Sequence, residues 1–171
     1  MIKHYGIPYM GSKDKIAKPL CEYMLNRHPD KKYFIDACCG GLAISSYVLQ
    51  NSKLKVIAND LDTNLYDFYN TFFYGDREKL LEDYGYKWMD RDTYNSLKLT
   101  ATGALRIMMV SVWTFGNKNE ERIAYLFGED IELQKELLHN LLVEGNENHL
   151  SNYFHKRERE RARVKYNSQM V

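Results

Sequence analysis

The expected fold depends on one stretch of sequence, Tyr33-Phe34-Ile35-Asp36-Ala37-Cys38-Cys39-Gly40-Gly41, and on the shorter run Val56-Ile57-Ala58-Asn59-Asp60 that follows it. An apolar run that ends in two glycines lets the backbone turn sharply and approach a ligand closely, because glycine has no Cβ and tolerates positive φ. Asp60 follows the glycines by about twenty residues, at the expected tip of the second strand, where a carboxylate can accept both hydroxyls of a ribose. The spacing predicts a βαβ unit that binds an adenosine-containing cofactor, and it leaves NAD, FAD and S-adenosylmethionine open.

The composition is that of an ordinary globular protein. With 171 residues, the chain has the length of one domain, or of one domain with a small appendage. The formal net charge is +1, so any surface that binds DNA must be local. The three cysteines include the adjacent pair Cys38 and Cys39, which favours reduced thiols in a cytoplasm over disulfides or a metal site. No apolar run of about eighteen residues predicts a membrane span.

The residues up to position 75 predict alternating helices and strands. A first helix with Ser12 as its N-cap is expected to bury one apolar face, formed by Ile16, Ala17, Leu20, Tyr23 and Met24. A helix over 43–50 follows the glycines, and the run 54–58 is apolar enough for a strand buried on both faces. A helix over 63–74 carries an aromatic stripe that is typical of a core. We therefore expect 1–75 to be an α/β part that binds the cofactor.

The pattern then changes, because between Arg77 and Leu142 the apolar residues recur at helical spacing with almost no strand signal. One such helix is expected over 131–143. These patterns predict a helical, recognition-type region over 76–150 and a basic C-terminal tail over 151–171. Because two strands alone do not sustain a doubly wound domain, the α/β sheet is expected to be incomplete.

Three short motifs, in this order, connect the chain with a known family. Tyr9-Met10-Gly11-Ser12-Lys13 is similar to the family's N-terminal P-x-G-G-K-type motif, and the run from Phe34 to Ala43 is similar to its F-x-E-P-F-x-G-S-G-A cofactor loop. Asn59-Asp60-Leu61-Asp62 is similar to the N-D-I-N that follows. The chain thus resembles the Dam-type (D12 class) DNA adenine N6-methyltransferases, in a phage-like variety. The resemblance implies a Rossmann-like methyltransferase fold, S-adenosylmethionine as cofactor, double-stranded DNA as partner, and a connection with restriction-modification.

The resemblance also assigns cofactor-binding candidates. Asp60 would hold the ribose, Asp36 would lie near the amino-acid end of the cofactor, and Lys13 would help with its carboxylate or with a nearby phosphate. The alternatives are carboxylates that only cap or stabilise a turn, and a solvated lysine. The complete set of candidates is Tyr9, Gly11, Lys13, Asp36, Cys38, Gly40, Gly41 and Asp60.

Candidates for DNA contacts come from the helical region and from the tail. They are Trp113, Asn117, Lys118 and Arg122, among which Asn117 suits a base edge. The tail from 155 to 165 has six basic and two acidic residues, a net charge of +4 that can bind phosphates. Its interleaved glutamates are also typical of a solvated helix, and this alternative is the favoured one. No catalytic residue and no metal ligand is assigned.

Two departures from the family pattern have consequences for function. Leu42 occupies the position of the third glycine, which puts a branched side chain where helix and strand approach closely or where the cofactor would lie. The family's catalytic D-P-P-Y motif is absent, since none of the three prolines is adjacent to another. We therefore expect the N-terminal part of a methyltransferase, inactive alone, whose sheet is completed by a second chain or by self-association. The alternative is a non-catalytic methyltransferase-like protein that binds or inhibits another protein or DNA.

Overall fold

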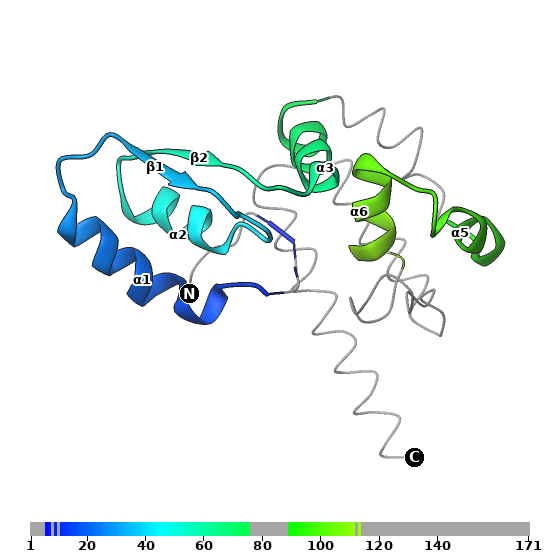
Figure 1. Cartoon of the computed structure of the whole chain (residues 1–171), viewed down its shortest axis with the longest axis horizontal. Coiled ribbons are helices and arrows are strands. Elements are labelled where there is room, and N and C mark those ends of the chain that lie inside the picture. The colour runs from blue at the N-terminus through cyan, green and yellow to red at the C-terminus, as the bar shows by residue number, and fades with distance from the viewer. Residues whose placement is uncertain (1–5, 8, 10, 76–88, 112, 114–171) are drawn as a thin grey trace, which may run out of the picture.

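The structure is a computed structural model that describes residues 6, 7, 9, 11–75, 89–111 and 113 (Figure 1). Its elements, in chain order, are α1 (Asp14–Arg27), β1 (Tyr33–Asp36), α2 (Ala43–Asn51), β2 (Lys55–Ala58), α3 (Thr63–Tyr74), α5 (Arg91–Leu97) and α6 (Gly103–Ser111). The expected alternation of helices and strands is confirmed, and α3 has the bounds that its aromatic pattern predicts.

The sheet has one covered and one uncovered face within the described part of the chain. β1 and β2 are parallel, with Phe34 beside Val56 and Ile35 beside Ile57. The connecting helix α2 packs on the face that carries Phe34 and Val56 (Figure 1). On the other face Ile35 is 66% exposed and Ile57 is 49% exposed. The prediction of a second strand buried on both faces is therefore wrong, because the described helices cover a single face.

Helix α1 packs against α2 through small side chains, so only Ala17 and Met24 of the face expected from the sequence contribute to the contact. Ala17 and Cys21 are fully buried, whereas Ile16, Leu20 and Tyr23 are each more than a third exposed. Small residues at the contact let two helices approach more closely, and the larger side chains are left at the rim. The expected N-cap also differs: Lys13 precedes the helix, and no side chain caps it. We call this first core the sheet cluster; it consists of Ala17, Cys21, Ala43, Ile44, Tyr47 and Val48.

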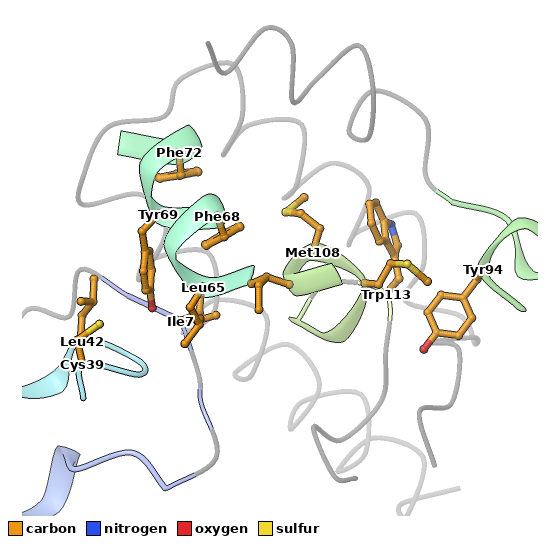
Figure 2. Packing of buried hydrophobic residues seen from close by; sticks show 12 residues of the cluster. Ile7, Cys39, Leu42, Leu65, Phe68, Tyr69, Phe72, Tyr94, Met108 and Trp113 are labelled. Atoms are coloured by element: carbon orange, nitrogen blue, oxygen red, sulfur yellow. The ribbon is translucent and has the colours of Figure 1, made fainter. Parts of the chain in front are cut away.

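A second core, here called the aromatic cluster, forms where α3 packs against α6 (Figure 2). The rings of Phe68 and Phe72 stack with centroids 5.9 Å apart, and Tyr69 meets Phe68 edge-on at 5.5 Å. Tyr94 of α5 and Trp113 are completely buried in the same cluster. Its buried members are Ile7, Cys39, Leu42, Leu65, Phe68, Tyr69, Phe72, Tyr94, Ile107, Met108, Met109 and Trp113. The aromatic stripe of α3 is therefore core, as predicted.

Side chains of α3 determine where α6 begins. Gly103, at φ +62°, donates its N–H to the Asn64 side-chain oxygen at 2.6 Å. A Cβ at this glycine would lie 3.2 Å from a carboxylate oxygen of Asp67. The aromatic cluster thus joins residues from both sides of position 75, and the predicted boundaries of the three parts stay predictions. The helix expected over 131–143 and the basic tail over 151–171 lie outside the described residues.

None of the helices that the structure describes is long and apolar enough to cross a membrane.

Candidate functional site

The glycine turn, residues 37–42, connects β1 with α2 and is held by the backbone of the second strand. The N–H of Cys39 donates to the carbonyl of Asn59 at 2.8 Å, and the N–H of Asn59 donates to the carbonyl of Asp36 at 2.8 Å. The side-chain amide of Asn59 also donates to the carbonyl of Ala37 at 3.1 Å. These bonds continue the pairing of the strands past their ends, so the turn lies at their carboxyl edge.

Asp60 stabilises the same turn from the end of β2. One carboxylate oxygen accepts the N–H of Gly40 at 2.8 Å, and the other accepts the N–H of Asp62 at 3.1 Å. Gly40 has φ +45°, a conformation that L side chains rarely adopt. The Asp60 carboxylate therefore accepts a hydrogen bond from the N–H of a glycine in the left-handed conformation. Each of its oxygens keeps a further lone pair for a ligand.

Two more side chains hold the turn, one from the residue before α1 and one from α3. Lys13, just before α1, donates from Nζ to the carbonyl of Cys38 at 2.9 Å. The buried hydroxyl of Tyr69, on α3, donates to the carbonyl of Gly40 at 2.8 Å. Figure 2 shows the Tyr69 ring extending toward Cys39 and Leu42 of the turn. The aromatic cluster thereby reaches the backbone of the glycine turn directly.

The segment before α1 passes so close to the turn that glycine is required on both sides. A Cβ at Gly6 would lie 2.3 Å from the carbonyl oxygen of Gly41, and a Cβ at Gly41 would lie 2.4 Å from that of Ile7. A Cβ at Gly40 would lie 2.9 Å from the ring of Tyr9. Because these glycines have no Cβ, the segment can pack directly against the turn.

A cavity of about 220 Å³ lies between this segment, the glycine turn and the start of α2. Seven of the eight cofactor-binding candidates line it: Tyr9, Gly11, Lys13, Cys38, Gly40, Gly41 and Asp60. Residues 12, 39, 43 and 44 complete the lining. Motifs that are far apart in the sequence therefore meet at one concave surface.

Asp36 is the candidate that does not line this cavity. Its carboxylate is buried, and one oxygen accepts both the N–H and the hydroxyl of Ser45, at 3.2 and 2.7 Å. Ser45 lies in the first turn of α2, where a negative charge is favourable because of the helix dipole. In this structure Asp36 fixes the direction of α2, and its role toward a cofactor stays a prediction.

Leu42 places its side chain outside the cavity. The residue has φ +61° and precedes α2, and its side chain is 8% exposed within the aromatic cluster. A left-handed conformation costs a non-glycine residue roughly 1–2 kcal/mol, and burial of a leucine side chain offsets a cost of that size. The leucine that stands in place of the third glycine therefore packs in the core, and its side chain does not fill the cavity.

Burial and negative neighbours shift the ionisation of several groups at the turn. Burial, followed by the charges of Asp62 and Asp60, raises the pKa of Tyr9. Burial also raises the pKa of Cys39 to about 11, with Asp60 and Asp36 adding to the effect, so this thiol stays protonated at neutral pH. Burial raises the pKa of Tyr69 as well, and its hydroxyl remains a hydrogen-bond donor. Cys38, by contrast, is exposed.

Of the four candidates for DNA contacts, the structure describes one. Trp113 is fully buried in the aromatic cluster, which leaves its ring no surface for a base or a phosphate in this conformation. Asn117, Lys118 and Arg122 lie outside the described residues. The structure therefore brings seven of the eight cofactor candidates to one cavity, and it buries Trp113.

Sequence reasoning missed three residues that shape the site. Tyr69 was assigned only to the core, although its hydroxyl binds the turn. The side chain of Asn59 and the hydroxyl of Ser45 were given no role, yet both bind the backbone or carboxylate beside the turn. A polar tip on an otherwise apolar helical stripe was the available signal for Tyr69, since a buried hydroxyl needs a partner.

Comparison with known proteins agrees with the motifs. The family model for the D12 class N6 adenine-specific DNA methyltransferases matches residues 9–168. No curated protein matches the chain, and neither does any solved structure.

Proposed function

The chain belongs to the D12 class N6 adenine-specific DNA methyltransferase family, and from this premise we propose that the cavity at the glycine turn binds S-adenosylmethionine. The family implies a Rossmann-like methyltransferase fold, a DNA substrate and S-adenosylmethionine as methyl donor. The observation that carries the proposal is the convergence of three separate motifs on one cavity at the carboxyl edge of a parallel sheet. Ligands of open α/β sheets bind at this edge.

Asp60 is the residue we assign to the ribose. Its carboxylate is half-buried, lines the cavity and is oriented by two backbone N–H groups. A carboxylate offers about four lone-pair positions, so two remain for the two ribose hydroxyls. The bonds to Gly40 and Asp62 hold it in place before the cofactor arrives, which reduces the ordering that binding requires.

Lys13 is assigned to the carboxylate of the cofactor's methionine part. An ammonium group has three donors, and the bond to the carbonyl of Cys38 uses one of them. The remaining donors lie at the cavity, where a charge-assisted bond to a carboxylate is stronger than a neutral one. Because Lys13 also binds the turn, its replacement is expected to affect both affinity and local order.

Calorimetric titration with S-adenosylmethionine tests the assignment. Asp60→Asn keeps the size of the side chain but removes its charge and half of its acceptors, and we expect at least about a tenfold loss of affinity, which corresponds to about 1.4 kcal/mol. The matched control is Asp67→Asn, which changes an exposed carboxylate on α3 away from the cavity and should alter affinity less than twofold. Absence of binding by the unmodified chain at millimolar cofactor would refute the proposal.

We further propose that this chain does not transfer the methyl group by itself. The amine of adenine is a weak nucleophile because its lone pair is delocalised into the ring, so an enzyme must hold it in line and accept its hydrogen bonds. In the family the D-P-P-Y motif does this, and the 171 residues have no adjacent prolines. Asp60 is occupied by the turn and by the ribose, so groups from outside these residues would complete the reaction.

Transfer of a radiolabelled methyl group to adenine-rich duplex DNA distinguishes the two parts of this proposal. The purified chain should bind cofactor and yet leave the DNA unlabelled. Labelling that depends on Asp60 would show that the chain holds its own catalytic groups. A chain that neither binds cofactor nor labels DNA would instead fit the alternative of a non-catalytic binding or inhibitor protein.

The uncovered face of the sheet supports the proposal that another chain completes it. Ile35 and Ile57 are neighbours across the two strands, and both are largely exposed among the described residues. A small sheet is rarely stable with an apolar face in water. Sedimentation equilibrium of the chain and of an Ile35→Thr, Ile57→Thr variant tests self-association: the unmodified chain should form dimers, and the variant should remain monomeric.

A further inference from the structure

A second and larger cavity, of about 490 Å³, lies at the opposite end of the strands from the glycine turn. It is bordered by the loop between α1 and β1 and by the loop between α2 and β2. These loops are adjacent because β1 and β2 are paired from Tyr33 and Lys55 onward, and the N–H of Lys55 donates to the carbonyl of Lys32 at 3.0 Å. Each strand has four residues, so roughly 10 Å of sheet, at about 3.3 Å per residue, separates the cavity from the glycine turn.

The side chains around this cavity are mostly basic or aromatic. Its lining includes four lysines, of which Lys31 and Lys32 precede β1, Lys53 precedes β2 and Lys55 begins β2. His28 and Tyr33 also line it. All four lysines are exposed. Nothing in the cofactor proposal uses these residues.

Little negative charge opposes these lysines. Asp30 forms an ion pair with Lys31 at 3.1 Å, and both side chains are more than half exposed. An exposed ion pair of this kind contributes little and is readily exchanged for another anion. Among the residues that the structure describes, none of those lining the cavity is acidic. On a chain whose formal net charge is only +1, four lysines around one cavity form a local positive field.

Tyr33 gives this surface a flat apolar element. Its ring is 56% exposed, and the ammonium group of Lys55 lies 6.0 Å from the ring centroid. Lysines interleaved with an exposed aromatic ring are typical of surfaces that follow a nucleic-acid backbone. A small anion would need one converging set of donors, whereas these lysines come from two loops and the start of β2 and surround an open cavity.

We propose that this cavity is a phosphate-binding surface for DNA, at the opposite end of the sheet from the cofactor cavity. The inference relies on the family's DNA substrate and is independent of cofactor binding. Lysine ammonium groups would pair with successive backbone phosphates and release condensed counterions, which makes the contribution independent of DNA sequence. The surface would increase residence on the duplex while another part of the protein reads the bases.

The test is duplex DNA binding by fluorescence anisotropy over a range of salt concentrations. Replacing all four lysines by glutamine should weaken binding about tenfold or more at low salt and reduce the slope of log affinity against log salt by about 2 to 4, since each phosphate contact contributes about 0.9. Replacing all four by arginine should preserve affinity and slope, because the charge remains. The substituted side chains are exposed, so the fold is expected to persist.

A pair of matched double variants isolates the position of the charge. Lys53→Gln with Lys55→Gln should lower the slope by about 1 to 2. Lys15→Gln with Lys18→Gln, which removes the same charge from exposed positions of α1, should leave it nearly unchanged. Equal effects of the two double variants, or no effect of the fourfold variant, would overturn the proposal.

Two further measurements identify what binds and keep this inference separate from the cofactor proposal. Acetylation of the lysines, followed by mass spectrometry, should show protection of all four by duplex DNA. Protection by inorganic tripolyphosphate and none by DNA would mean a small-anion site and would overturn the proposal. Titration with S-adenosylmethionine should give the same affinity for the fourfold variant and the unmodified chain. If the chain does not bind the cofactor, only this titration fails, and the DNA measurements are unaffected.

Discussion

The two cores of this molecule differ in their side chains and in what they do for the glycine turn. The sheet cluster is built mainly from small and aliphatic residues and positions α2 on the sheet. The aromatic cluster is built on the rings of α3 and on the methionines of α6. The division falls between adjacent residues, because Leu42 belongs to the aromatic cluster and Ala43 to the sheet cluster. The cavity therefore lies at a junction, and its shape depends on both cores.

Both cores contribute to the site, because α3, which builds the aromatic cluster, also reaches the glycine turn. The sheet cluster packs α2 on the sheet, and the neighbouring bonds from Ser45 to Asp36 fix its direction. The aromatic cluster supplies the bond from Tyr69 to Gly40. A chain without α3 would keep the strands but lose a donor to the turn. Variants in each core should therefore have separable effects on stability and on cofactor affinity.

The largest expected effect comes from the centre of the aromatic cluster. Phe68→Ala removes a ring that is 1% exposed, and we expect a loss of about 3–5 kcal/mol in the free energy of unfolding, as for other buried aromatic residues. Urea denaturation followed by circular dichroism measures it. The control is Tyr66→Ala on the same helix, whose ring is 64% exposed and whose loss should change stability by about 0.5 kcal/mol or less. Equal losses would show that this cluster is not the principal core.

The next effect concerns the close approach of the N-terminal segment to the turn. Gly41→Ala would place a Cβ 2.4 Å from the carbonyl oxygen of Ile7, a backbone atom that cannot move aside cheaply, so we expect a loss of about 3 kcal/mol. Gly11→Ala has open space but φ +79°, and its strain should cost about 1–2 kcal/mol. Thermal unfolding of both variants shows which substitution costs more stability. Gly11→Ala as the more damaging change would contradict the close approach.

A matched pair of tyrosine variants compares the two cores directly. Tyr69→Phe leaves the buried carbonyl of Gly40 without this donor, which should cost about 1–3 kcal/mol and weaken S-adenosylmethionine binding. Tyr47→Phe, in the sheet cluster, removes a bond to Glu22, whose side chain is 49% exposed and can turn to water. Its cost should be about 1 kcal/mol or less, with cofactor affinity unchanged. Calorimetry that finds equal losses of affinity would remove the special role of Tyr69.

The smallest effect is a dependence of stability on alkaline pH, with one thiol in each core. Burial raises the pKa of Cys21 and of Cys39 to about 11, above the value of about 8.5 for an unfolded thiol. The unfolded state therefore loses these protons first, so the contribution is fully present below about pH 8.5 and is lost as pH rises toward about 11.

Chemical denaturation at pH 8 and pH 10 measures this contribution. Cys21→Ala and Cys39→Ala should each reduce the loss of unfolding free energy between these pH values by roughly 1–2 kcal/mol. Cys38→Ala, which removes the exposed thiol, is the matched control. An unchanged loss in both buried-thiol variants would contradict the raised pKa values.

The order and type of the elements could be predicted from sequence, since periodicity and turn residues report on local geometry. The bounds of α3 and the position of the glycine turn agree with expectation. The buried face of α1 could be predicted only in part, because its neighbour α2 is selected by the sheet. Ala17 is buried as expected, whereas Cys21 makes the contact in place of Ile16 and Leu20. The burial of β2 differs from expectation for a related reason. An apolar run does not show which face of the strand other elements will cover.

The sequence by itself determined the family, the glycine turn and seven residues that line one cavity. These depend on local backbone geometry, which glycine and the order of the motifs specify. The tertiary structure alone showed that the Leu42 side chain leaves the cavity, that the Asp36 carboxylate binds α2, that Trp113 is buried, and that Tyr69 supports the turn. Each of these depends on which of several neighbours a side chain meets after the chain has packed, and spacing along the sequence does not contain that choice.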